Sequence, residues 1–155
     1  MDKKLRGKLK NGRFQNVPPI RSKAMSAVRS KGNRTTEVTF RMALMRAGLR
    51  GWKLHARHLP GNPDFYFPEY RLAVFIDGCF WHGCPKHGHI PATNPEYWKA
   101  KIRINRQRDR RKKDHLGRLG VHTLRMWEHA LSKPDRAVRR IQATILHLSR
   151  DGSPN

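Results

Sequence analysis

Residues 77–87, Asp-Gly-Cys-Phe-Trp-His-Gly-Cys-Pro-Lys-His, contain both cysteines of the chain, two histidines, an aspartate and two adjacent aromatic rings. This segment directly follows residues 72–76, a continuous apolar run that is typical of a central, buried strand. The strand thus leads straight into a cluster of metal-ligand and acid–base side chains. A fold for this sequence must therefore hold that short segment in place at one end of its central strand.

Hydrophobic periodicity on either side of this strand predicts an α/β fold. Three further strands are expected at residues 52–58, 63–67 and 121–126. Helices are expected at 21–28, from Thr35 or Thr36 as cap to Gly48, from 94 to about 116, and from Pro134 onward. The main order is α-β-β-β-α-β-α, which predicts a mixed sheet with helices around it.

Apolar residues mark the buried faces of these helices. In the helix that ends at Gly48 the predicted buried side comprises Val38, Ala43, Leu44 and Ala47. In the last helix it comprises Val138, Ile141, Ile145 and Leu148. The long central helix is expected to have Asn94 as its capping residue and Pro95 at its first position.

The charge of the chain indicates a polyanionic partner. The 155 residues suffice for one domain with its own core, and their formal net charge is +23. Solubility alone needs a net charge of only about 2–8 in a small domain. Binding to phosphates releases condensed counterions, so nucleic acid is the natural partner. An anionic membrane surface is less favoured, because the sequence has no basic amphipathic helix lined with bulky apolar residues.

Other compositional signals favour a cytoplasmic protein. The sequence contains no apolar run of transmembrane length and no secretory signal at its start. Residues 1–20 are rich in lysine and arginine, so we expect a flexible basic arm that becomes ordered on a partner. For residues 1–12 a disordered tail or a cloning remnant is the alternative interpretation. Residues 21–150 are expected to form the folded domain.

The two cysteines fit a structural metal better than a disulfide. Four residues separate Cys79 from Cys84, and two separate Cys84 from His87. Such short spacings bring ligands around a tetrahedral zinc ion. The fourth ligand is expected to be His129, which follows the last strand, with His89 as the local alternative. The competing interpretation is a pair of buried free cysteines beside surface histidines.

Three further residues are candidates for chemistry. His82 lies between the two cysteines, where zinc would hold it rigid and leave its ring free for proton transfer. Asp109 shares a helix face with Trp98, Ile102 and Asn105, so it is a candidate partner for that ring. A salt bridge to Arg106 or Lys113 explains Asp109 equally well. Asp64, in a predicted strand, is either a magnesium ligand or a turn aspartate after Pro63.

Glu37 and Asp77 are less specific. Glu37 stands in the first turn of its helix, where an acid complements the helix dipole, and it could also reach a water on a metal. The sequence leaves the role of Asp77 open.

Adjacent aromatic rings and a basic helix indicate duplex DNA. Phe80 and Trp81 stand together in a polar loop, and Trp98 begins the long helix. Large rings on exposed loops can wedge between base steps. The long helix carries nine lysines and arginines against two aspartates in its second half, and phosphates are the natural counter-charge.

Taken together, these residues and motifs resemble those of the very-short-patch repair (Vsr) endonucleases. The resemblance spans roughly residues 20–150, and long ordered sets of motifs are more specific than any single pattern. It rests on residues 21–26, Thr36-Glu37, 60–65, 75–87, 91–93, Trp98, Lys101, Asn105, 108–111 and 121–128.

The resemblance implies a restriction-endonuclease-like fold, with a mixed central sheet flanked by helices and a structural zinc site. It also implies magnesium-dependent nicking of one DNA strand at a T:G mismatch, 5′ to the thymine. By position, Asp64 and the backbone carbonyl of Ile76 would bind magnesium. His82 would be the acid–base group with Asp109 as its partner, and Glu37 would hold a metal-bound water.

The same resemblance implies the remaining contacts. The zinc ligands would be Cys79, Cys84, His87 and His129, although some relatives have a cysteine at the position of His129. Phe80, Trp81 and Trp98 would intercalate beside the mismatch, with Lys101, Asn105 and Arg108 as further DNA-binding residues. We expect a monomer, functionally linked to a DNA cytosine methyltransferase and to repair proteins. The alternatives are a zinc-stabilised nucleic-acid-binding protein without catalysis and a nuclease of the same fold with another DNA target.

Overall fold

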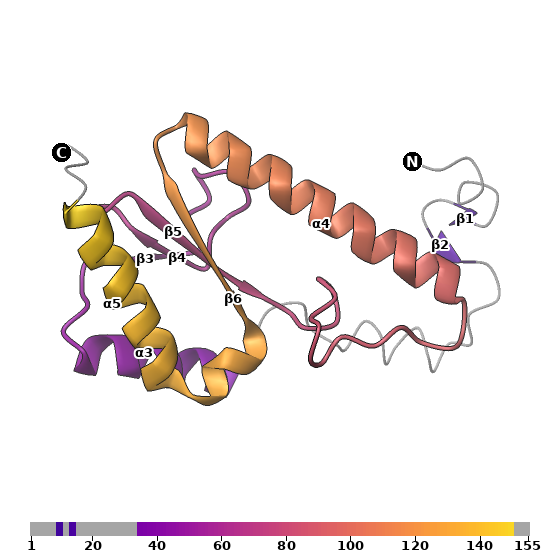
Figure 1. Ribbon diagram of the computed structural model, residues 1–155, viewed down its shortest axis with the longest axis horizontal. Helices are drawn as coiled ribbons and strands as arrows, with labels where there is room; N and C mark the ends of the chain where they lie inside the picture. Colours follow the sequence, from indigo (N-terminus) through magenta and orange to yellow (C-terminus); the bar gives the residue numbers. More distant parts are fainter. Residues whose placement is uncertain (1–8, 11–12, 15–33, 151–155) are drawn as a thin grey trace.

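The structure, a computed structural model, describes residues 9–10, 13–14 and 34–150. Within these ranges the chain forms three α-helices, one 3-10 helix and six strands (Figure 1). In chain order the elements are β1 (Leu9–Lys10), β2 (Arg13–Phe14), α3 (Arg34–Arg46), β3 (Lys53–Leu54), β4 (Phe65–Phe67), β5 (Leu72–Asp77), α4 (Pro95–Arg118), β6 (His122–Trp127), η1 (Glu128–Ser132) and α5 (Pro134–Arg150).

Four strands form one mixed sheet in the order β3-β4-β5-β6. The pairs β3–β4 and β4–β5 are antiparallel, and β5 and β6 are parallel. In the parallel pair Val74 lies opposite Leu124, and Asp77 lies opposite Trp127. The chain segments after Asp77 and after Trp127 therefore leave the sheet at the same edge.

Helices cover both faces of this sheet (Figure 1). On one face α3 and α5 bury a core that includes Phe40, Leu44 and Ile141 against Phe65 and Val74. The other face packs against the C-terminal end of α4 through a smaller core of Ala56, Leu59, Ala73, Phe75, Leu116 and Val121. The N-terminal half of α4 runs past the sheet edge, beside the segment that follows β5 (Figure 1). This overhang is what brings helix residues to the functional segment.

The strongest sequence patterns gave correct elements. β5, β6, α4 and α5 lie where they were predicted, and the order α-β-β-β-α-β-α is confirmed across residues 34–150. The predicted buried face of α5 is also confirmed, because Val138, Ile141, Ile145 and Leu148 are all buried.

The predicted strand at 52–58 is wrong over most of its length. β3 ends at Leu54, because His55 has a φ of 46° and so turns the chain out of the extended conformation. Asp64 likewise lies just before β4 rather than inside it. The backbone N–H of His55 donates to the Asp64 carbonyl at 3.1 Å, so the two turns support one another.

One detail of the predicted helices is wrong, and another is confirmed in position only. Val38 was predicted to be buried but is 47% exposed. Phe40, which the pattern did not select, is fully buried in α3. Asn94 is the N-cap of α4 and Pro95 takes the first position, as predicted, but the Asn94 side chain makes no capping hydrogen bond and the residue adopts a left-handed conformation with φ 57°. Its backbone carbonyl instead accepts from the N–H groups of Tyr97 and Trp98.

The N-terminal predictions are tested only in small part. β1 and β2 pair as an antiparallel ladder, with Leu9 opposite Phe14, which the sequence pattern did not predict. The predicted helix at 21–28 and the domain boundary at residue 20 lie outside the described residues. None of the helices that the structure describes is long and apolar enough to span a bilayer.

Candidate active site and metal centre

Asp64 is tied to the end of the central strand. Its Oδ2 accepts a hydrogen bond from the backbone N–H of Ile76 at 2.7 Å. Burial raises the pKa of Asp64, while the Ile76 N–H and nearby His55 lower it and the charges of Asp77 and Glu37 raise it. The aspartate is thus fixed beside β5, and one of its carboxylate oxygens is held by the backbone of that strand.

His82 and Asp109 form a hydrogen-bonded pair. The Nδ1 atom of His82 lies 2.6 Å from the Oδ2 atom of Asp109, and both side chains are largely buried. A carboxylate on Nδ1 fixes the ring and leaves Nε2 as the atom that can exchange a proton with a substrate. Of the alternatives that the sequence left open for Asp109, the structure supports the histidine and not the salt bridges to Arg106 or Lys113.

Arg125 completes this group, and the sequence analysis did not single it out. Its guanidinium makes two hydrogen bonds to Asp77 and lies 3.2 Å from Asp109 Oδ2. Ligand atoms of Asp77, His82 and Asp109 lie within 4.8 Å of one another, close enough for a metal. Because the guanidinium already supplies positive charge to both acids, we assign the trio to a hydrogen-bonded network rather than to a metal.

Glu37, in α3, has its own partners. It forms an ion pair with Arg41 one turn later in α3, and its Oε1 lies 3.7 Å from His55 Nε2. Its charge acts on Asp64. The carboxylate of Glu37 is thus already engaged within α3 and by His55, and its predicted role toward a metal-bound water stays a prediction.

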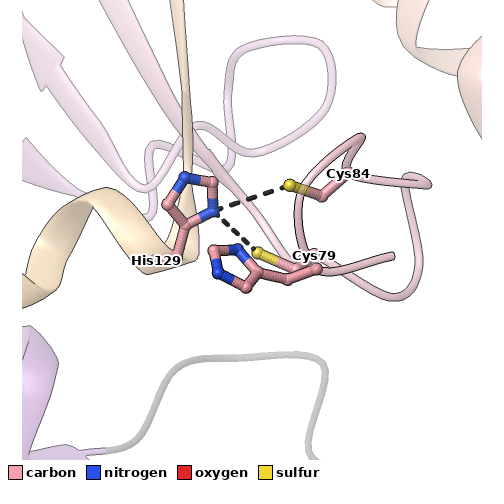
Figure 2. A group of neighbouring side chains, drawn as sticks. Cys79, Cys84 and His129 are labelled. Carbon is pink, nitrogen blue, oxygen red and sulfur yellow. Dashed lines mark hydrogen bonds between the residues drawn. The ribbon is translucent and has the colours of Figure 1, made fainter. Parts of the chain in front are cut away.

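Four candidate zinc ligands converge at the sheet edge. The ligand atoms of Cys79, Cys84, His87 and His129 lie within 4.8 Å of one another. His129 Nδ1 is 3.2 Å from Cys79 Sγ and 3.6 Å from Cys84 Sγ, and both sulfurs point toward that ring (Figure 2). Tetrahedral zinc with ordinary bond lengths separates nitrogen and sulfur ligands by about 3.5 Å. The four residues therefore fit zinc in number, type and spacing.

The chemistry of the ligands agrees with that geometry. Both cysteines are free thiols, and burial lowers the pKa of His129, helped by nearby His87 and Lys86. A neutral imidazole is the form that binds a metal. His89, the local alternative for the fourth ligand, instead packs its ring 5.6 Å from Phe80.

The loop that carries His82 is held by α4 as well. Arg106 donates from Nε to the His82 carbonyl at 3.0 Å and from Nη2 to the Gly83 carbonyl at 2.6 Å. Gly83 has a φ of 65°, and a Cβ there would lie 2.8 Å from Ile102 Cγ2. A side chain at this position would collide with α4, so the close approach of the loop to the helix depends on glycine.

Phe80, Trp81 and Trp98 form one aromatic cluster. Ring centroids are 5.1 Å apart for Phe80–Trp81 and Phe80–Trp98, and 6.2 Å apart for Trp81–Trp98. Asn105 donates to the Trp81 carbonyl at 2.9 Å, which joins the cluster to α4. The three rings are half-buried, so they stand at the surface beside His82 as a rigid group.

Further basic residues lie on α4. Lys101 is half-buried and Arg108 is exposed. A groove of about 880 Å³ also runs between residues 83–90 and α4, and its cationic lining comprises Lys99, Arg103, Arg106 and Arg110. Among the described residues that line it there is no acid. The helix thus presents positive charge along the groove beside the segment that carries His82.

Comparison with known proteins shows to which family the chain is similar. A family model described as DNA mismatch endonuclease Vsr matches residues 16–87. The type II nicking enzyme V.NaeI of Lentzea aerocolonigenes is 41% identical over 132 residues, covering 83% of this chain and 78% of the relative. The DNA mismatch endonuclease Vsr of Escherichia coli K12 is 40% identical over 117 residues, covering 72% of this chain and 70% of the relative. This chain belongs to the Vsr family.

Membership in the Vsr family makes this protein a DNA endonuclease, a hydrolase of DNA repair. Its mixed four-stranded sheet with three helices fits the restriction-endonuclease-like fold that the sequence predicted. DNA is accordingly its partner, in agreement with a net charge of +23.

The raised pKa of Asp64 predicts how stability depends on pH. The folded protein binds the carboxyl proton more tightly than the unfolded chain, so this group makes folding less favourable as pH rises from the unfolded pKa through the raised one. We expect metal-free Asp64→Asn, which cannot ionise, to be more stable than the parent at neutral pH, with the difference vanishing in acid. Urea unfolding of both proteins in chelator across pH measures this. The prediction is wrong if the parent becomes more stable relative to Asp64→Asn as the pH rises.

Proposed function

We propose that this Vsr-family protein is a magnesium-dependent nickase that cuts one DNA strand 5′ to the thymine of a T:G mismatch. The observation that carries the proposal is the His82–Asp109 pair, 2.6 Å apart, in one network with Asp77, whose charge also acts on Asp64. A fixed imidazole and a metal-binding carboxylate at one strand end are the two parts that hydrolysis of a phosphodiester needs.

The proposed roles follow from the contacts. Asp64, through the oxygen that Ile76 N–H does not occupy, and the Ile76 carbonyl would hold magnesium, which neutralises charge building on the phosphate. His82 would transfer a proton at Nε2 while Asp109 holds Nδ1. Glu37 would accept a hydrogen bond from water on the Asp64 side.

We further propose that zinc is structural and is bound by Cys79, Cys84, His87 and His129. Four protein ligands would fill the tetrahedral coordination of zinc and leave no position for substrate or water, so zinc bound there would not act on substrate. Its contribution would be to hold His82, which lies between two of the ligands in the chain.

DNA recognition is assigned to the surface around the aromatic cluster. Phe80, Trp81 and Trp98 would enter the stack beside the mismatch, since half-buried rings braced by one another lose little freedom on insertion. Lys101, Asn105 and Arg108 would contact the duplex, and the basic residues 1–20 would embrace it. A monomeric state, a cytoplasmic location and a link to a cytosine methyltransferase stay predictions.

End-labelled duplexes that carry each single mismatch test the substrate and the metal together. We expect one cut, 5′ to the thymine of T:G, that requires magnesium and stops with chelator, and matched T:A and C:G duplexes to stay intact. Product length on a sequencing gel locates the cut. A protein that retards duplexes but never nicks them would support the binding-module alternative.

A second candidate function is a nuclease of the same fold with another DNA target. It is supported by several relatives that are described as type II nicking enzymes. Nicking that depends on flanking sequence and is equally fast at other mismatches would identify a same-fold nuclease with a different target. Duplexes in which the flanking bases are varied around one T:G pair separate this outcome from strict mismatch recognition.

A further inference from the structure

One guanidinium connects the sheet to the long helix at the catalytic centre. Arg125, on β6, donates from Nε to Asp77 Oδ2 at 2.8 Å and from Nη2 to Asp77 Oδ1. The same Nη2 lies 3.2 Å from Asp109 Oδ2 on α4. Arg125 therefore binds an acid on β5 with its planar fork and reaches a second acid on the helix with one arm of that fork.

The Asp109 oxygen that Arg125 reaches is the one that pairs with His82. Asp109 Oδ2 lies 2.6 Å from His82 Nδ1 and 3.2 Å from Arg125 Nη2. The His82 hydrogen bond and the Arg125 ion pair act on the same oxygen and together restrict the carboxylate, whereas the His82 contact alone would leave it freer to rotate about its Cβ–Cγ bond. The orientation of the His82 ring therefore depends on a residue that does not touch it.

The surroundings of Arg125 keep it still. Its side chain is 24% exposed, and those of Asp77 and Asp109 are 11% and 14% exposed. Its guanidinium also lies 5.2 Å from the Phe75 ring, its register partner on β5. Opposite charges attract one another more strongly where burial lowers the local dielectric constant, so these contacts restrain the Arg125 side chain.

We propose that Arg125 is a positioning residue, which holds Asp109 so that its Oδ2 accepts the Nδ1 proton of His82 and the ring presents Nε2 to the phosphodiester. This inference rests on the nickase function proposed above. A purely structural ion pair between β5 and β6 would need only Asp77; the contact to Asp109 is what a positioning role requires.

A double-mutant cycle tests the dependence on Asp109. The proteins are the parent, Arg125→Met, Asp109→Asn and the double variant, compared in single-turnover nicking of saturating T:G duplex. We expect Arg125→Met to lower the rate about 10- to 100-fold, the range found for outer-shell hydrogen bonds, with duplex Kd changed less than about threefold. The double variant should be no slower than Asp109→Asn, because the two act as one unit.

Two further proteins interpret the cycle. Arg125→Lys keeps the charge but not the fork, so we expect a rate between those of the parent and Arg125→Met. Arg139→Met removes an exposed arginine of α5 and should nick at the parental rate. If Arg125→Met does not fold, the same cycle with Arg125→Lys decides. Losses that multiply in the double variant, or a changed Kd with an unchanged rate, would overturn the proposal.

Nuclear magnetic resonance of histidine-labelled protein gives a readout without DNA. The parent should show a sheltered Nδ1-bound proton of His82, absent in Asp109→Asn and broadened in Arg125→Met. That signal unchanged in Arg125→Met would contradict positioning. If the parent shows it but nicks no T:G duplex, the proposed function fails while the Arg125 contact stands.

Discussion

Replacing Asp64 with asparagine should lower the rate of magnesium-dependent nicking about a thousandfold or more. Asparagine keeps an oxygen that can accept from the Ile76 N–H but loses the negative charge that holds a hard cation. Lewis-acid stabilisation by a metal is worth several kcal/mol, and each 1.4 kcal/mol is a factor of ten in rate. Single-turnover nicking and duplex gel retardation, measured side by side, check this result, and binding should change little.

The matched control is Asp114→Asn, which removes an exposed acid of α4 and should nick like the parent. Together with the stability gain expected for metal-free Asp64→Asn, the two results would identify an acid kept for catalysis at a cost to folding. The catalytic site described above is wrong if Asp64→Asn nicks as fast as the parent in magnesium.

Replacing Cys84 with serine should release zinc and destabilise the fold. Cys84 is buried, and its sulfur is one of four ligand atoms within 4.8 Å of one another. Loss of a structural metal is among the few single changes that cost more than about 4 kcal/mol. Since single domains have about 5–15 kcal/mol in all, we expect a large fall in Tm and loss of nicking. Zinc content and thermal unfolding are the measurements.

His89→Ala is the control for the zinc prediction, because this neighbouring histidine lies outside the four-ligand group and packs on Phe80. It should keep one zinc per chain and a near-parental Tm. The reverse pattern, in which His89→Ala loses zinc and His129→Ala keeps it, would show that the local histidine is the fourth ligand. Full zinc in Cys84→Ser would contradict the site as a whole.

Sequence patterns were sufficient where burial is extensive, on both faces of β5 and along one face of α5. The apolar run of β5 and the 3.6-residue periodicity of α5 both predicted elements that the structure contains, because burial of that much apolar surface outweighs local preference. β3 shows the opposite case. Its alternating pattern continues past Leu54, but the left-handed conformation of His55 ends the strand, and no periodicity reports a single backbone angle.

The candidate site was predictable in its members more than in its connections. Helical spacing places Asp109 on a face, yet it cannot say which of several cations that face meets; the resemblance implied His82, and only the structure decides between His82 and the salt bridges. Arg125 was missed for the same reason. A signal existed: Leu124 and Met126 are buried on one face of β6, which places Arg125 on the opposite, partly covered face, where a charge needs a partner.

The parallel pairing of β5 with β6 also sets when this enzyme can first work. Cys79 and His129 are 50 positions apart in the chain yet 3.2 Å apart in space, and Arg125 comes from the same late strand. Contacts of such long sequence separation form late, after the intervening helix has been made. A chain emerging from the ribosome therefore exposes His82 before α4 and β6 can anchor it, and the complete site can form only after residues 122–129 have been made.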